Sequence, residues 1–146
     1  MKDLVDVVTA AWGWTGVVPM AVTKTSPFGH LIIRDAEGVY WYLDPELGTL
    51  ERIATDDGAL ALHMADAEVQ NIWHAASLVK LARETIGIAE PGRCYALKTP
   101  AMLGGGYEPA NLCTLPLDEL IGFTGDLARQ IGNLPEGAQV KVKVVD

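Results

Sequence analysis

The sequence predicts an α+β fold in which an antiparallel sheet packs against three to four helices. Segments rich in β-branched and aromatic residues, separated by turn residues, fill the first third of the chain. Later segments repeat apolar residues every three or four positions, as helices do. Strands and helices therefore come in blocks, which favours α+β over a doubly wound sheet. With 146 residues, 49% of them hydrophobic, we expect one domain over residues 1–146.

The N-terminal half is expected to begin with a helix and to continue as a three-stranded meander. Residues 3–12 space their apolar side chains as a helix does, and Gly13 follows as a stop signal. The expected strands cover residues 28–34, 39–43 and 49–53. Both connections contain acids and a glycine, which indicates tight turns.

The middle strand of this meander carries three consecutive aromatic residues. Side chains alternate across a strand, so Trp41 lies on one face, and Tyr40 and Tyr42 lie on the other. We expect the tryptophan face to belong to the core and the tyrosine face to be exposed.

A long helix is expected from Asp66, a suitable N-cap, to Gly87. Its apolar residues at steps of three and four form one core stripe, made of Ile72, Ala75, Val79, Ala82 and Ile86. Trp73 points away from this stripe. We expect it to be buried on a second face of the helix, since a helix in the middle of a small domain often packs on two sides.

The C-terminal part is expected to contain three strands and one helix. Two strands cover residues 93–99 and 111–115, and an amphipathic helix follows over 117–131. A last strand begins near residue 140, where valines alternate with lysines.

The loop at residues 101–109 contains three consecutive glycines. A phosphate-binding loop leads directly into a helix and usually carries a lysine, and neither feature follows here. We therefore expect Gly104 and Gly105 to serve a tight turn or a close approach of the backbone.

Acidic residues are concentrated in one part of the chain. Nine carboxylates and a single arginine lie between Asp35 and Glu68, so the formal charge of this segment equals the −8 of the whole chain. A confined acidic field steers association with a basic partner. The same charge argues against direct binding to nucleic acid or to a membrane surface, because both require clustered Lys and Arg.

These acids are interleaved with aromatic residues, which protein interfaces use as anchors within a polar rim. The alternative is a merely solubilising surface. We expect the turns at 35–38 and 44–46 and the pair at 56–57 to be exposed. The predicted partner-binding residues are Asp35, Glu37, Tyr40, Tyr42, Asp44, Glu46, Asp56, Asp57, Asp66 and Glu68.

No motif in the sequence indicates catalytic, metal-binding or cofactor-binding residues. Cys94 lies in an apolar strand pattern, where a buried, inert thiol is the usual outcome. His30, His63 and His74 lack the spacing of metal ligands. A pair of carboxylates working as a hydrolase dyad stays open, although no single pair stands out.

The expected compartment is the cytoplasm. The sequence contains no apolar run long enough to span a membrane, and its N-terminus does not resemble a signal peptide. The two cysteines match no zinc or redox spacing, which fits a reducing environment.

Several motifs together resemble a family of bacterial immunity proteins that accompany type VI secretion effectors. The resemblance runs from about residue 25 to the C-terminus, and its most specific pattern is Gly-Gly-x-Tyr-x-x-x-Asn, which ends at Asn111. A third glycine, Gly106, stands where the family pattern has a polar residue. The motifs are Pro27-Phe28-Gly29-His30-Leu31, Tyr40-Trp41, Asp44-Pro45, Pro91-Gly92-Arg93-Cys94-Tyr95, Leu103-Gly104-Gly105-Gly106-Tyr107 with Asn111-Leu112, Arg129-Gln130 and Leu134-Pro135-Glu136-Gly137.

The resemblance implies an antitoxin that neutralises a cognate secreted toxin by binding it and blocking its active site. Such a protein needs no catalytic residues, and the shared motifs imply scaffold positions rather than contacts. A toxin that acts on nucleic acids or nucleotides has a basic active-site cleft, which the acidic segment would complement. Two alternatives stay open, a small hydrolase that uses acidic residues and an adaptor module without a toxin partner.

Overall fold

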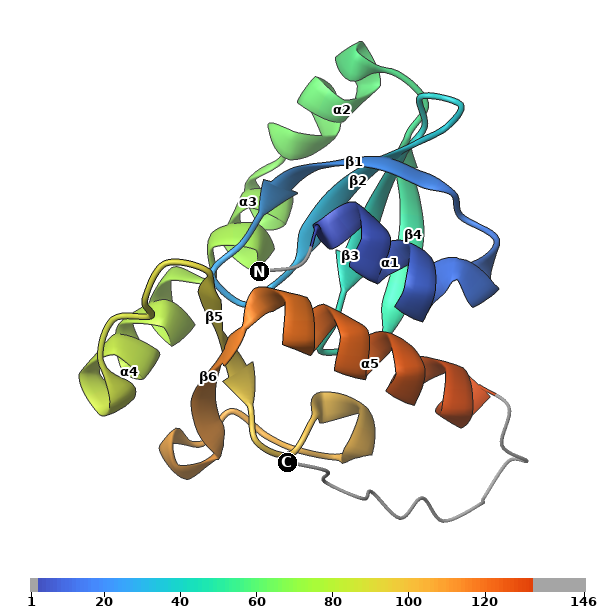
Figure 1. Ribbon diagram of the computed structural model, residues 1–146. Coiled ribbons are helices and arrows are strands. Elements are labelled where there is room, and N and C mark those ends of the chain that lie inside the picture. Colours follow the sequence, from blue (N-terminus) through green and yellow to red (C-terminus); the bar gives the residue numbers. More distant parts are fainter. Residues whose placement is uncertain (1–2, 133–146) are drawn as a thin grey trace.

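The computed structural model describes residues 3–132 and confirms the predicted α+β class (Figure 1). A four-stranded antiparallel sheet has the order β1-β2-β3-β4, and a separate antiparallel pair joins β5 and β6. The helices are α1 (Leu4–Trp12), α2 (Asp57–Met64), α3 (Ala67–His74), α4 (Ala76–Ile86) and α5 (Leu117–Gly132). The strands are β1 (Pro19–Thr25), β2 (Leu31–Asp35), β3 (Tyr40–Asp44), β4 (Thr49–Ala54), β5 (Arg93–Leu97) and β6 (Leu112–Pro116). The last strand expected from the sequence lies outside the described residues.

The predicted meander is present as β2, β3 and β4, and β1 extends it by one edge strand. Strand β1 was not expected from the sequence, because its pattern of side chains is irregular. Its pairing with β2 shifts register between Pro19 and Ala21 and again between Val22 and Lys24. Each shift moves side chains to the other face, so no regular alternation marks the strand in the sequence.

One face of the large sheet is covered by α1 and α5, which lie side by side (Figure 1). The two helices approach closely at Gly125, where a Cβ atom would lie 2.6 Å from the backbone oxygen of Ala11. Trp12 lies fully buried there, and its indole N–H donates to the backbone oxygen of Ile121 at 2.9 Å. The predicted stripe of the C-terminal helix forms this contact, so this prediction is confirmed.

The opposite face of the sheet is covered by α2 and α3. Ile32 and Tyr40 of the sheet pack there against Met64 and Trp73 of the helices. Trp73 is therefore a core residue, as expected. The prediction of an exposed tyrosine face is wrong, because α3 lies over it: Tyr40 is buried, and the ring of Tyr42 meets that of Trp73 edge-on at 5.8 Å.

The helix expected over residues 66–87 is broken into α3 and α4. Ala75 ends α3 in a left-handed conformation, with φ 45°, and α4 starts directly after it. The break redirects the apolar stripe, so that Ile72 on α3 is 60% exposed while Ala82 on α4 is fully buried against the second sheet. No glycine or proline marks the break, and the periodic pattern alone therefore predicted one continuous helix.

The second sheet carries the glycine-rich loop between β5 and β6. Gly104 adopts φ 87°, and a Cβ atom on Gly105 would lie 1.8 Å from the backbone oxygen of Thr99. The side chain of Asn111 closes the loop by bonding the backbone N–H and oxygen of Thr99 and the backbone oxygen of Gly106. A tight turn with a close backbone approach is thus confirmed.

Candidate functional site

The nine carboxylates of the acidic segment divide into two groups. Six of them accept hydrogen bonds from within the chain, namely Asp35, Asp44, Glu46, Asp56, Asp57 and Asp66. Within residues 3–132, the side chains of Glu37, Glu51 and Glu68 have no such partner and are exposed. Acids of this segment contribute to two regions, a polar cluster inside the molecule and an acidic surface outside it.

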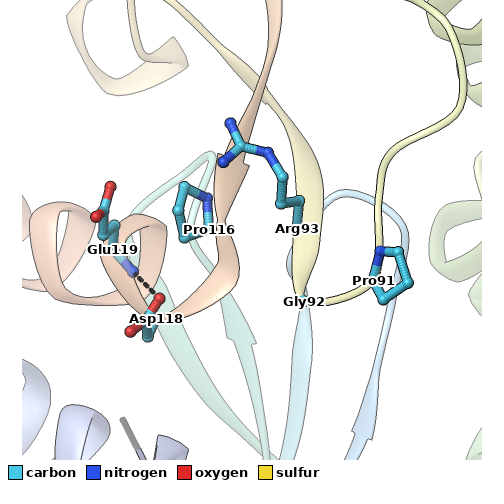
Figure 2. A pocket seen from close by; sticks show the side chains of 6 residues that line it. All are labelled: Pro91, Gly92, Arg93, Pro116, Asp118 and Glu119. Carbon is cyan, nitrogen blue, oxygen red and sulfur yellow. Dashed lines mark hydrogen bonds between the residues drawn. The ribbon is translucent and has the colours of Figure 1, made fainter. Parts of the chain in front are cut away.

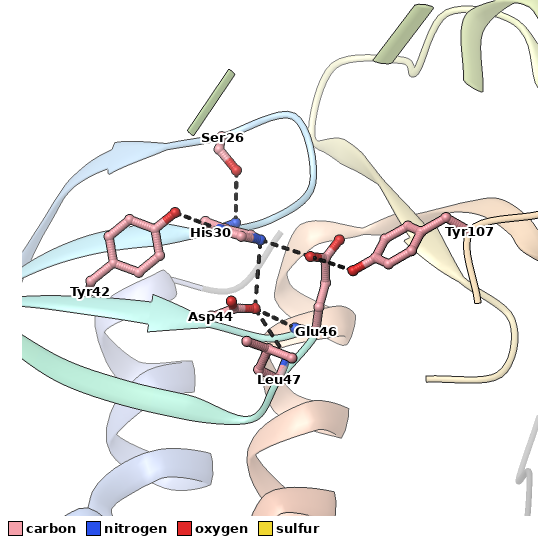
Figure 3. Close-up of polar contacts among 7 residues, drawn as sticks. All are labelled: Ser26, His30, Tyr42, Asp44, Glu46, Leu47 and Tyr107. Atoms are coloured by element: carbon pink, nitrogen blue, oxygen red, sulfur yellow. Dashed lines mark hydrogen bonds and ion pairs between the residues drawn. The ribbon is translucent and has the colours of Figure 1, made fainter. Parts of the chain in front are cut away.

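The inner cluster gathers around His30 at the start of β2 (Figure 3). One ring nitrogen, Nδ1, lies 2.6 Å from the hydroxyl of Tyr42. The other, Nε2, lies 3.2 Å from Glu46 Oε2 and 3.6 Å from Asp44 Oδ1. The hydroxyl of Tyr107 donates to the same Glu46 oxygen at 3.1 Å. We call these five residues the inner cluster.

Local structure holds each acid of the inner cluster in place. Asp44 ends β3, and its Oδ1 accepts the backbone N–H groups of Glu46 and Leu47, at 2.9 and 3.1 Å. These bonds form the turn into β4 and aim the side chain of Glu46 at His30. The backbone N–H of His30 donates to Ser26 Oγ at 3.0 Å, which fixes the start of β2. The prediction that the turn at 44–46 is exposed is wrong, because this network draws it inward.

Both tyrosines of the inner cluster are held in their neutral, protonated form. Burial raises the pKa of Tyr42 above its usual range, and the charges of Asp44 and Glu46 raise it further. Burial and the adjacent Glu46 raise the pKa of Tyr107 in the same way. Their hydroxyls can therefore donate hydrogen bonds but not supply negative charge.

This cluster was not expected from the sequence, because its members come from three separate segments. His30, Asp44 and Tyr107 all occur in the motifs that carry the family resemblance. That shared origin is the signal that could have grouped them. Spacing rules for metal ligands search within one short segment and overlook such a group.

The acidic surface consists of five exposed acids and two exposed apolar side chains. The apolar members are Leu62 on α2 and Ile72 on α3. The acids are Glu37, Asp56, Asp57, Asp66 and Glu68. Strand register brings Arg34, Tyr40 and Ala54 together, so the turn with Glu37 and the start of α2 lie at the same end of the sheet (Figure 1). The expected exposure of residues 56–57 is confirmed.

Three acids of this surface also have structural roles. Asp56 caps α2 by accepting the backbone N–H of Ala59, and Asp66 caps α3 through the backbone N–H of Val69. Asp57 accepts the hydroxyl of Tyr40. Glu37 and Glu68 are therefore the members whose charge can be changed with least effect on the fold.

A pocket at the start of α5 is lined by Pro91, Gly92, Arg93, Pro116, Asp118 and Glu119 (Figure 2). Arg93 donates to the backbone oxygen of Thr114 at 3.0 Å, and the backbone N–H of Glu119 donates to Asp118. Glu119 is exposed and Asp118 half-buried. This pocket does not provide the pair of desolvated acids that a hydrolase dyad requires.

Within residues 3–132, no helix is both long and apolar enough to pass through a lipid bilayer. No curated protein matches the chain. Residues 59–128, from α2 to α5, match the family model described as T6SS immunity protein Tdi1, C-terminal, where T6SS denotes the type VI secretion system. This agrees with the resemblance seen in the sequence motifs and supports a role as an immunity protein. Residues 59–128 of this chain are thus similar to the C-terminal region of the type VI secretion immunity protein Tdi1.

Proposed function

We propose that this protein acts in the cytoplasm as an antitoxin, binding a cognate type VI secretion toxin through the acidic surface and occluding its active site. The observation that carries the proposal is the exposure of five acids of the −8 segment, in the turn after β2 and at the starts of α2 and α3, together with two exposed apolar side chains on the same two helices. The matched family supports an immunity role, and the surface suggests how that role is performed.

The charge of the surface selects the kind of toxin. A toxin that acts on nucleic acids or nucleotides needs a cleft lined with Lys and Arg to hold phosphates. Carboxylates on the antitoxin would satisfy those cations and exclude the substrate at the same time. Opposite charges also accelerate the encounter, which matters for a protein that must reach the toxin before its substrate does.

The two exposed apolar side chains would form the apolar centre of the proposed interface, which charged residues alone do not provide. Leu62 is 78% exposed and lies between the acids that cap α2 and α3, and Ile72 lies on the following helix. Interfaces draw most of their free energy from apolar contacts within a polar rim. We expect Leu62 to enter the partner and the acids to surround it.

The proposal replaces part of the binding set expected from the sequence. Tyr40 and Asp44 are buried, and Tyr42 and Glu46 face the inner cluster, so these four are not available for contact. Asp35 accepts bonds from Trp41 and Val39 and serves the fold first.

The decisive experiment reverses the charges of two side chains that have no hydrogen-bond or ion-pair partner among residues 3–132. We expect Glu37→Lys with Glu68→Lys to weaken binding of the toxin, the product of the adjacent gene, by about 2 kcal/mol or more, roughly thirtyfold in Kd. The matched control is Glu84→Lys with Glu90→Lys, which makes the same change in net charge at two exposed acids outside the surface. Kd is measured by calorimetry, and protection by survival of cells that co-express the toxin.

The association rate gives a second readout. The rate for the wild-type chain should fall about tenfold or more from low to high ionic strength, and the charge-reversed variant should lose most of this dependence. Equal loss in the variant and in the control would show that only total charge matters. Full protection by the Glu37 and Glu68 variant would place the interface elsewhere.

A further inference from the structure

We infer that the inner cluster is a binding site for one divalent transition-metal ion, Zn²⁺ in particular, held by His30, Asp44 and Glu46. The site lies inside the molecule, away from the acidic surface. The inference does not depend on the proposed function.

The geometry of the three side chains fits a metal ion. One nitrogen of His30 and one carboxylate oxygen from each acid lie within 4.8 Å of one another. The two measured separations from His30 Nε2 are 3.2 and 3.6 Å. Zn²⁺ binds such atoms at about 2 Å, so two ligands of a tetrahedral ion lie roughly 3.4 Å apart. The observed spacing therefore admits the ion with only small movements of the side chains.

The charge of the cluster calls for a cation. The side chains of His30, Asp44 and Glu46 are only 6%, 13% and 16% exposed. Within residues 3–132, neither carboxylate forms an ion pair with Lys or Arg. Two carboxylate charges without a cation are costly in a poorly hydrated site. A divalent ion with a neutral imidazole balances both carboxylates.

The hydrogen bonds around the cluster match the surroundings of a metal site. Glu46 Oε1 is buried and has no hydrogen-bond partner among the described residues, so it is available as a further ligand atom. The ring nitrogen that faces away from the carboxylates, His30 Nδ1, lies 2.6 Å from the Tyr42 hydroxyl. This contact fixes the orientation of the ring, as polar partners of metal-bound histidines do. Tyr107 holds the other oxygen of Glu46.

The ligand set favours Zn²⁺ over the alkaline-earth ions. Imidazole nitrogen combined with carboxylate oxygen suits Zn²⁺ and its neighbours in the first transition row. Mg²⁺ and Ca²⁺ prefer ligand sets made of oxygen alone. A bound ion would fasten the turn after β3, the start of β2 and, through Tyr107, the glycine-rich loop.

The test is a Zn²⁺ titration of the chelator-treated full chain by calorimetry. We expect one ion per chain, no competition by Mg²⁺, and affinity lower by about tenfold or more in both Glu46→Gln and His30→Gln. The control carries His63→Gln with His74→Gln, which removes the two histidines outside the cluster, and should bind as the wild type does. No binding by the wild type, or unchanged affinity in Glu46→Gln, would overturn the inference.

A second measurement needs no substitution. X-ray absorption at the zinc edge of the wild-type chain should show one imidazole among oxygen ligands and no sulfur. Sulfur ligation would assign the ion to Cys94 or Cys113 and refute the site at His30. The answer does not depend on whether the substituted chains fold.

Discussion

The two regions built from the acidic segment differ in what their carboxylates do. In the inner cluster, Asp44 and Glu46 face a histidine and two phenols and take part in the fold. On the acidic surface, Glu37 and Glu68 have no side-chain partner among the described residues. Residue type and position in the sequence do not separate them. A backbone N–H or a hydroxyl within reach ties an acid to the fold, and its absence leaves the side chain in solvent.

The largest expected effect is on the free energy of unfolding, and it comes from a substitution in α3, the helix that covers the tyrosine face of the sheet. Trp73 lies on the inner side of α3 and Ile72 on the outer side. Trp73→Ala should lower the free energy of unfolding by about 3–5 kcal/mol, because it opens a cavity against Tyr42 and Met64. Ile72→Ala, one position away, should change it by about 0.5 kcal/mol or less. Urea denaturation compares the two, and a larger loss in Ile72→Ala would reverse the assignment of the faces.

A smaller effect is expected at the loop that brings Tyr107 to the inner cluster. Gly105→Ala would drive a methyl group into the backbone of Thr99 and should cost about 3 kcal/mol of stability. Gly104→Ala introduces strain at positive φ but no collision, and should cost only about 1 kcal/mol. Thermal unfolding measures both. Equal losses would mean that backbone conformation, rather than the close approach, governs this loop.

The smallest expected effect distinguishes two acids within the acidic surface. Asp66 caps α3, whereas the side chain of Glu68, two residues later, forms no hydrogen bond with any residue that the structure describes. Asp66→Ala should therefore cost about 1 kcal/mol of stability, and Glu68→Ala about 0.5 kcal/mol or less. Chemical denaturation of both variants tests this difference. If Glu68→Ala costs as much as Asp66→Ala, Glu68 belongs with the structural acids.

The parts of the fold that the sequence predicted correctly are those with strong local patterns. Helices α1 and α5 follow from apolar periodicity, and the meander follows from aromatic and β-branched runs between turns. The break at Ala75 and the strand β1 were missed, since one rests on a left-handed alanine and the other on register shifts. Neither leaves a local signature.

The candidate sites show the same limit. Local charge density located the acidic segment and its exposed members, such as Glu37 and Glu68. The inner cluster joins the start of β2, the turn after β3 and the glycine-rich loop, and only the packed structure brings His30 next to Glu46 and Tyr107. The prediction of an exposed tyrosine face was wrong for a related reason. The helix that covers this face, α3, ends at a break that the sequence does not mark.

The two-sided character of α2 and α3 has a consequence for how such a protein can change over generations. Met64 and Trp73 on the inner side are bound to the sheet, while Leu62, Glu68 and Ile72 on the outer side contribute little to it. Substitutions on the outer side can accumulate without loss of folding. Under the proposed function, substitutions at a few outward positions would alter the contact with the toxin, while the inward positions stay the same.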